Sequence, residues 1–151
     1  MPEQLAQTFR ARLRAAEQKL NTITESNADE RYYKESWTRK QVLGHLLDSA
    51  ANNHVRFVVA TIEGTFTGPF YAQNDWVNLH GYQTLPWAVL LEQWRGQNAM
   101  LAQVVERIPQ EKLTSQCHIG NDAPVTLKFL IEDYLDHMDH HVADIAKEVS
   151  D

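Results

Sequence analysis

Residues 126–145 read TLKFLIEDYLDHMDHHVADI, in which core-type side chains return every three or four positions. This spacing is typical of one face of an α-helix, because an α-helix has 3.6 residues per turn. The face contains Leu127, Leu130, Ile131, Tyr134, Met138, His141 and Ile145. The segment therefore predicts an amphipathic helix that begins at Thr126 and ends at about Val149.

Three further segments show the same periodicity, and no segment of useful length alternates with period two. They run from about Pro2 to Ile23, from Thr38 to Gly64, and from after Thr84 to Pro109. Thr38 and Gln41 have the spacing of a capping box, and Gly64 suits the end of a helix. Together the four segments predict an all-α protein that folds as a four-helix bundle.

The connection between the second and third predicted helices covers residues 65–83. A loop of this length is uncommon in a compact domain unless it crosses the bundle or lines a site. Fully extended it would cover roughly 60 Å, against roughly 35 Å for a helix of this size. We therefore expect up-down-down-up topology, with a long crossover between helices 2 and 3. The connection from Pro109 to Val125 is also long, so loop length alone does not prove this order.

The composition is that of one globular domain that covers all 151 residues. The net charge is −6 and the basic residues are scattered, which argues against a nucleic-acid partner. Cys117 is the single cysteine, so an internal disulfide and a CxxC zinc knuckle are excluded. No signal pattern and no apolar run of roughly 18 residues is present, so we expect a cytoplasmic protein without a membrane partner.

His137 and His141 lie four residues apart in the last predicted helix. Side chains at this spacing stand one above the other, roughly 6 Å apart along the axis, so both rings can reach one ion. Their face also carries Tyr134 and Ile145, so the rings point where core side chains would. The pair alone is a weak signal. It either binds a metal or consists of two buried imidazoles that need hydrogen-bond partners.

A third imidazole can come from His45, which takes an apolar position in the second predicted helix. If the second and fourth helices are antiparallel, His45 lies about 10 Å from the start of one, and the histidine pair about 15 Å from the end of the other. A parallel arrangement matches less well, at about 10 and 20 Å. Three neutral imidazoles suit Zn²⁺ or Ni²⁺ and leave positions open for water or substrate. His140 is rotated by about 100° from His141, so we expect it to face outward or border the site.

Three motifs in combination resemble the DinB-like superfamily, which includes the bacillithiol transferase type. They are Trp37-Thr38 at the start of a helix, Gly44-His45-Leu46-Leu47-Asp48-Ser49 within it, and His137-Met138-Asp139-His140-His141 in the last helix. The stretch from Phe70 to Val77, followed by Gly81-Tyr82, is also similar to that family. The resemblance covers the chain from Leu5 to Ile145.

The resemblance implies an up-down-down-up bundle, often a homodimer, that binds a divalent metal through three histidines. By position the ligands are His45, His137 and His141, whereas His140 is not a ligand. Members with known activities are thiol-dependent enzymes. The resemblance thus implies a thiol S-transferase that uses a low-molecular-weight thiol as cosubstrate and acts on a small electrophile. Coordination to the metal would deprotonate such a thiol at neutral pH.

Further residues are candidates for contacts beside the ligands or in a substrate pocket: Asp48, Asn52, Tyr82 and His140. Asp48 would either orient His45 or make an ordinary helix-surface contact. Two other functions stay open. One is a metal-stabilised binding or stress-response protein without turnover. The other is a metal-dependent hydrolase, which needs a base near bound water that no HExxH-type motif supplies.

Overall fold

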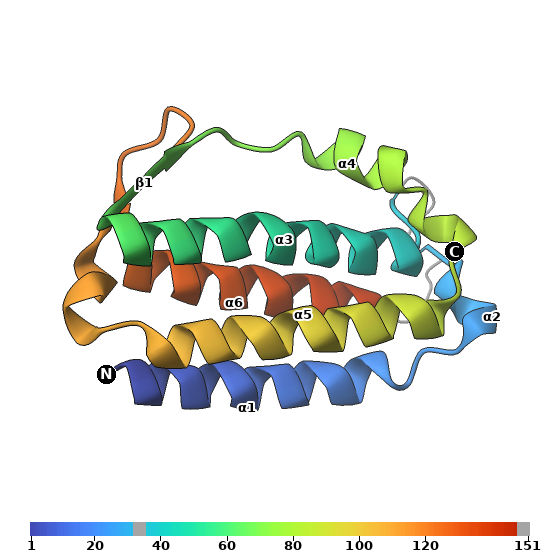
Figure 1. Ribbon diagram of the computed structural model, residues 1–151. Coiled ribbons are helices and arrows are strands. Elements are labelled where there is room, and N and C mark those ends of the chain that lie inside the picture. Colours follow the sequence, from blue (N-terminus) through green and yellow to red (C-terminus); the bar gives the residue numbers. More distant parts are fainter. Residues whose placement is uncertain (32–35, 148–151) are drawn as a thin grey trace.

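Four long helices pack side by side in the computed structural model, which describes residues 1–31 and 36–147 (Figure 1). They are α1 (Pro2–Leu20), α3 (Arg39–Glu63), α5 (Trp87–Arg107) and α6 (Leu127–Ile145). The predicted all-α four-helix bundle is confirmed. The predicted end of the last helix, Val149, lies outside the described residues. No helix in the described part of the chain is long and apolar enough to cross a membrane.

The helices α1 and α6 run in one direction, and α3 and α5 run in the other (Figure 1). Arg10, in the first half of α1, bonds to Glu106 near the end of α5. Arg39, the first residue of α3, donates from Nε to the carbonyl oxygen of Ile145, the last residue of α6. Both pairs are therefore antiparallel, and the order along the chain is up, down, down, up.

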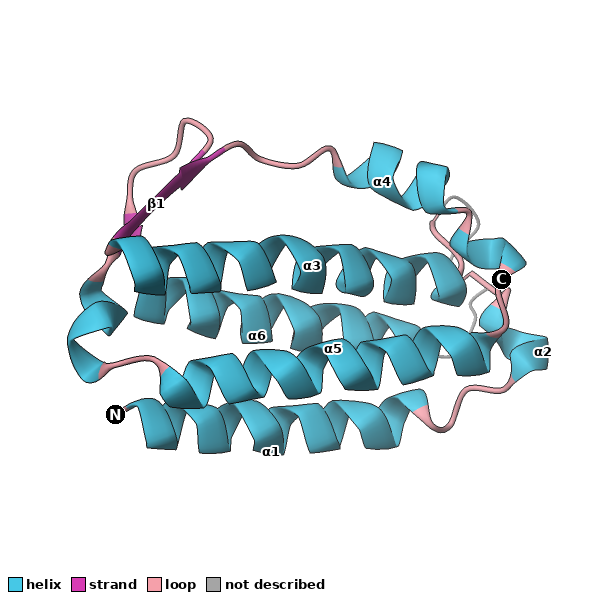
Figure 2. Cartoon of the chain, in the orientation of Figure 1, coloured by secondary structure: helices cyan, strands magenta, loops and turns pink. Residues whose placement is uncertain are grey.

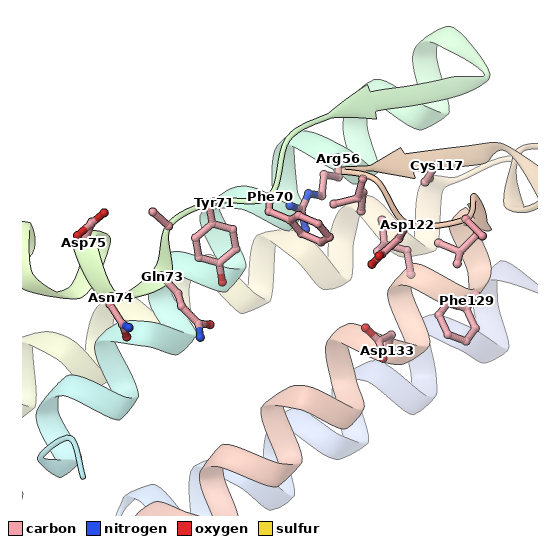
Figure 3. A pocket seen from close by; sticks show the side chains of 15 residues that line it. Arg56, Phe70, Tyr71, Gln73, Asn74, Asp75, Cys117, Asp122, Phe129 and Asp133 are labelled. Atoms are coloured by element: carbon pink, nitrogen blue, oxygen red, sulfur yellow. The ribbon is translucent and has the colours of Figure 1, made fainter. Parts of the chain in front are cut away.

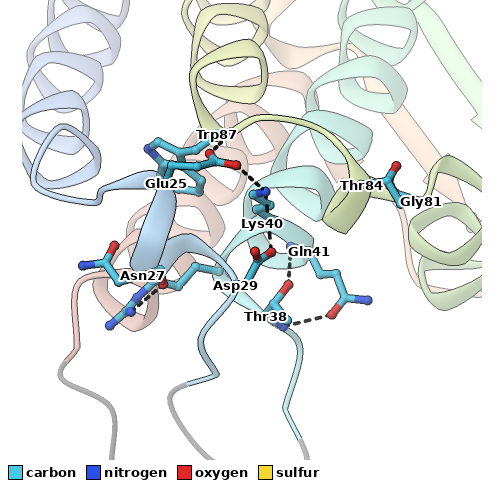
Figure 4. Close-up of polar contacts among 10 residues, drawn as sticks. Glu25, Asn27, Asp29, Thr38, Lys40, Gln41, Gly81, Thr84 and Trp87 are labelled. Carbon is cyan, nitrogen blue, oxygen red and sulfur yellow. Dashed lines mark hydrogen bonds and ion pairs between the residues drawn. The ribbon is translucent and has the colours of Figure 1, made fainter.

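Local side-chain chemistry sets most helix ends. Thr38 Oγ1 accepts from the backbone N–H of Gln41, while Gln41 Oε1 accepts from the N–H of Thr38, which is the expected capping box (Figure 4). Gly64 ends α3 with φ of 78°, a conformation that glycine adopts without steric cost. The helix α1 ends at Leu20 rather than at Ile23, because the N–H groups of Thr22 and Ile23 bond to carbonyl oxygens three residues back instead of four.

A short helix, α2 (Glu25–Ala28), joins the starts of α3 and α5. Lys40 in the first turn of α3 is 3% exposed, and its Nζ lies 2.9 Å from Glu25 Oε1 and 3.5 Å from Asp29 Oδ1. Glu25 Oε2 accepts from the backbone N–H of Trp87, the first residue of α5, at 2.7 Å (Figure 4). One carboxylate thus links the two N-terminal helix ends, where the helix dipole favours negative charge.

The crossover between α3 and α5 contains β1 (Thr65–Gly68), α4 (Gln73–His80) and the 3₁₀ turn η1 (Tyr82–Thr84) (Figure 2). The connection before α6 contains the 3₁₀ turn η2 (Gln110–Thr114), β2 (Gln116–Ile119) and β3 (Val125–Thr126). The strand β2 pairs with β1 in parallel and with β3 in antiparallel orientation. The sequence did not predict this sheet, because its strands are too short to show alternation. The sheet ties the crossover to the segment that leads into α6.

Candidate metal centre

Three imidazoles from α3 and α6 meet near one end of the bundle. His45 lies in the second turn of α3, and His137 and His141 lie on successive turns of α6. One nitrogen of each ring lies within 4.8 Å of the other two. The Nε2 atoms of His45 and His137 are 3.2 Å apart, and the three ring centroids are separated by 4.5 to 5.0 Å. The antiparallel packing of α3 and α6 therefore brings together the three histidines that the sequence singled out.

The donor set fits one divalent ion. Two nitrogens at about 2.1 Å from a tetrahedral zinc are roughly 3.4 Å apart, close to the Nε2 separation of His45 and His137. Without an ion, Nε2 of His45 has only Nε2 of His137 as a partner among the described residues, and the buried Nδ1 atoms of His45 and His141 have none there. Buried polar atoms without partners are costly. The arrangement therefore suits a cation better than it suits three free imidazoles.

Burial also keeps the three rings neutral. Burial first, and the neighbouring imidazoles second, lower the pKa of His45 to about 3 and the pKa of His141 to about 4. Burial likewise lowers the pKa of His137 from its ordinary value. At pH 7 each ring can thus offer a lone pair to a metal without first losing a proton.

The side chains around the three histidines differ in exposure. The side chain of His140 is 74% exposed and lies 3.8 Å from Asp144 at the helix surface, and its ring centroid lies 5.4 Å from that of His141. The ring of Trp37 lies 5.1 Å from that of His45. His45 itself is 1% exposed. Solvent therefore reaches this side of the cluster poorly.

Asp48 makes no hydrogen bond to His45, which was one of the two roles that the sequence left open for it. It is 2% exposed, accepts from the hydroxyl of Tyr82 through Oδ1, and lies 3.3 Å from Nδ1 of His80. Asp48 is three residues after His45 and lies about 60° from it around the helix, and its contacts are with residues of the crossover instead of with the histidine cluster. Asp48 and Tyr82 line a separate cavity of about 340 Å³. Their bond attaches the crossover to α3.

Asn52 also lies away from the histidines. Its Nδ2 donates to the backbone oxygen of Asp48 within α3, at 2.9 Å. The side chain borders a hollow of about 620 Å³ beneath the crossover, together with Pro69 and Trp76. The structure therefore brings neither Asn52 nor the Asp48–Tyr82 pair into the cavity that His137 lines.

His137 lines one of two cavities that share part of their walls. The smaller, about 150 Å³, is lined by Ser49, Asn53, Arg56, Tyr71, Leu130, Asp133, Tyr134 and His137. The larger, about 720 Å³, shares four of these residues, namely Arg56, Tyr71, Leu130 and Asp133. It lies between the crossover and the β2–β3 segment (Figure 3). A ligand at His137 can therefore extend into a space large enough for a small cofactor.

Sequence reasoning missed Arg56 and Asp133, although their spacing is informative. Asp133 lies four residues before His137, which puts its carboxylate one turn away on the same face of α6. Arg56 lies eleven residues after His45, and eleven residues are close to three whole turns, so it lies on the same face of α3. Cys117 borders the larger cavity but is 1% exposed, and burial raises the pKa of its thiol.

The comparison with known families agrees with this geometry. The model of the DinB superfamily matches residues 6–145. The chain belongs to the DinB superfamily. Within the superfamily it is 28% identical over 134 residues to YfiT of Bacillus subtilis (strain 168), over 86% of this chain and 74% of that protein. It is 21% identical over 126 residues to OB0413 of Oceanobacillus iheyensis, over 83% and 72%. Both relatives are named as candidate metal-dependent hydrolases.

Solved structures share the DinB fold. YfiT superimposes with a TM-score of 0.84 at 22% identity, covers 95% of this chain, and is described as having an unusual four-helix bundle topology. This chain spans 83% of that structure. The mycothiol-dependent maleylpyruvate isomerase superimposes with a TM-score of 0.79 at 15% identity, over 96% of this chain and 60% of the isomerase. At these identities the likenesses show the fold and not the reaction.

Proposed function

We propose that this DinB protein is a metal-dependent thiol S-transferase. His45, His137 and His141 would bind one divalent ion, Zn²⁺ or Ni²⁺. The observation that carries the proposal is the position of this neutral three-histidine cluster beside a cavity of about 150 Å³ that adjoins one of about 720 Å³. Such a space admits a low-molecular-weight thiol and a small electrophile together.

In the proposed reaction, different residues bind the ion, accept a proton, exclude water and contact the ligand. A bound ion supplies the acidity that turns a thiol into a thiolate at neutral pH. Asp133 shares the cavity of His137 and can accept the proton that the thiol releases. The ring of Trp37 packs beside His45, which limits access of water from that side. Ser49 and Asn53 present polar groups to a ligand in the smaller cavity.

The metal is tested by elemental analysis of the purified protein. We expect about one divalent ion per chain in the wild type, as for a three-histidine site. His45→Ala and His141→Ala should each lose it, because two imidazoles bind far more weakly than three. His140→Ala is the matched control and should keep the ion, since this side chain is 74% exposed beside the site. Full metal content in both ligand variants would rule out the site.

The reaction is tested by incubating the metal-loaded protein with a panel of small thiols and a model electrophile such as 1-chloro-2,4-dinitrobenzene. The expected product is the thioether, formed only when thiol is present. The variant that lacks all three histidines should not form it above the uncatalysed rate. Metal retention without turnover of any thiol would favour the alternative of a metal-stabilised binding or stress-response protein.

Metal-dependent hydrolysis is the second candidate, and Asp133 favours it. This carboxylate borders the cavity of His137 and supplies the base that the sequence motifs lacked. The names of both relatives, as candidate metal-dependent hydrolases, also support hydrolysis. Hydrolysis of an activated ester without thiol, lost in Asp133→Asn at unchanged metal content, would select this function. Thioether formation that requires added thiol would instead select the transferase.

The proposal includes a homodimer that acts in the cytoplasm on a small-molecule ligand. The family resemblance supports the dimer, and the single buried cysteine suits a reducing compartment. Light scattering coupled to size-exclusion chromatography should give twice the 17.4 kDa mass of one chain.

A further inference from the structure

Arg56 is a buried cation whose only polar contact in the described structure is weak. The residue is 9% exposed. Its Nη2 donates to the carbonyl oxygen of Pro69 at 3.4 Å, and its guanidinium lies 5.9 Å from the centre of the Tyr71 ring. No aspartate or glutamate of the described residues forms an ion pair with it. A guanidinium has five N–H donors, so most of its capacity is unused.

The position of Arg56 relates it to the histidine site. It lines the smaller cavity together with His137, and it also lines the larger cavity. Figure 3 shows its side chain extending from α3 into the wall of the larger cavity, with Asp133 across the space on α6. A molecule that reaches from His137 into the larger cavity would therefore have the guanidinium in the wall beside it.

We propose that Arg56 binds a carboxylate group of the ligand that occupies these cavities. The proposal deepens the proposed function and rests on it for the identity of the ligand, which is the thiol cosubstrate or the electrophile. A guanidinium binds a carboxylate through two parallel hydrogen bonds, and burial strengthens such a pair. The ligand anion would supply the partner that the protein does not.

The other charges of the cavity limit the negative charge that a ligand can carry there. Asp75, Asp122 and Asp133 line the larger cavity, and Arg56 is its only arginine or lysine. A dianion such as a phosphate monoester would be repelled by three carboxylates more strongly than a monoanion would. We therefore infer a carboxylate as the anion.

A purely structural role is the competing explanation. Arg56 contacts Pro69 and Tyr71, so it could serve only to hold the crossover on α3. In that case its replacement would lower thermal stability but would not change which ligands bind. The two roles are separated by comparing an acid with the amide of the same molecule.

The experiment measures dissociation constants by calorimetry for N-acetylcysteine and for its carboxamide, with the zinc-loaded protein. The wild type should bind the acid at least about tenfold more tightly, since hydrogen bonds to a charged group are the stronger kind. Arg56→Gln should bind both compounds equally, with unchanged zinc content. Arg56→Lys keeps the positive charge but cannot form the two parallel hydrogen bonds of a guanidinium. It should retain part of the preference for the acid. Equal binding of acid and amide by the wild type, or binding of neither, would overturn the proposal.

A second titration separates this proposal from the metal site. It uses the S-methyl derivatives of both compounds, which carry no free thiol, and protein from which metal has been removed. The acid should still bind more tightly than the amide, because the discrimination depends on Arg56 and not on the ion. If the chain proves not to bind metal, this result still decides the role of Arg56. A preference for the acid that persists in Arg56→Gln would assign the recognition to another residue and contradict the proposal.

Discussion

Gly44 lies next to His45, and its missing side chain decides how the crossover packs on α3. A Cβ atom at this position would lie 1.9 Å from Cδ2 of Tyr82, far inside any real contact. The Tyr82 ring fills that space, and its hydroxyl donates to Asp48. Glycine within a helix is otherwise unfavourable by about 1 kcal/mol relative to alanine. Close packing against Tyr82 therefore accounts for the glycine.

Gly44→Ala should destabilise the protein by about 1–3 kcal/mol, because the Tyr82 ring has to move and overpacking has this typical cost. Urea denaturation followed by circular dichroism measures the free energy of unfolding. Gly96 in α5 is the matched control, since a Cβ there would meet nothing within 4 Å. Gly96→Ala should stabilise the protein by up to about 1 kcal/mol. Equal stabilisation by both changes would contradict the packing argument.

The residues of the candidate site were predictable to different degrees. His137 and His141 are visible because their spacing of four belongs to one helix, and His45 could be added because helix depth can be estimated from rise per residue. Arg56 and Asp133 enter the same cavity, but an arginine or aspartate on a helix is ordinarily a solvated surface residue. In the structure Arg56 is buried, as Arg39 and Lys40 are, but unlike those two residues it forms no ion pair with a carboxylate of the described residues.

At the scale of elements, α5 and α6 are linked through one buried hydrogen bond. The hydroxyl of Tyr134 on α6 donates to Oδ1 of Asn98 on α5, and the two residues are 5% and 1% exposed. Tyr134 also stacks on Phe9 of α1, with ring centroids 5.7 Å apart, and meets the ring of Phe57 of α3 at 6.0 Å. One side chain therefore contacts all three other bundle helices.

Tyr134→Phe should cost about 1–3 kcal/mol, because it leaves the Asn98 oxygen buried without a donor. Chemical denaturation measures the loss. The double variant Tyr134→Phe, Asn98→Leu removes both polar partners, and it should recover part of the stability. If the two single effects simply add in the double variant, the bond contributes no coupling energy and the prediction is wrong.

Stability should also fall at alkaline pH. Burial raises the pKa of Tyr134 and the pKa of Tyr82, and the bond to Asp48 adds to the effect at Tyr82. An unfolded tyrosine loses its proton near pH 10, whereas these two stay neutral in the folded protein. The folded state thus binds more protons above about pH 10, and its stability, fully present below that pH, decreases as the pH rises. Denaturation at pH 9 and pH 11 tests this, and Tyr134→Phe should show a smaller decrease.

The long elements were predictable because caps and apolar periodicity are local properties. Thr38, Gly64 and Thr126 each occupy the helix terminus that their side-chain chemistry suggests. The strands β1, β2 and β3 form by pairing between segments far apart in the chain, so no local sequence pattern predicts them. The short helix α4 lies in the crossover, where the sequence predicted a long connection and no helix.

For the whole molecule, the histidine cluster connects the start of α3 to the later part of α6. A metal that binds only the folded state stabilises it in proportion to the logarithm of its concentration relative to Kd, by about 4 kcal/mol at a thousandfold excess. A chelator should therefore lower the Tm of the wild type and of His140→Ala. It should leave His45→Ala unchanged, because that variant has no ion to lose. Thermal denaturation with and without chelator measures this, and identical Tm values in the wild type would contradict it.

The sequence by itself determined the four helices, their caps and the three histidines, because these depend on spacing along one chain segment and on the rise of a helix. The tertiary structure decided which further residues share the space of His137. Asp48 and Tyr82 pair with each other beneath the crossover, while Arg56 and Asp133 face the cavity. The physical reason is that the crossover and the small sheet supply the rest of the wall of the larger cavity, opposite α3 and α6. Their positions follow from pairing and packing between distant segments, and no local pattern encodes these.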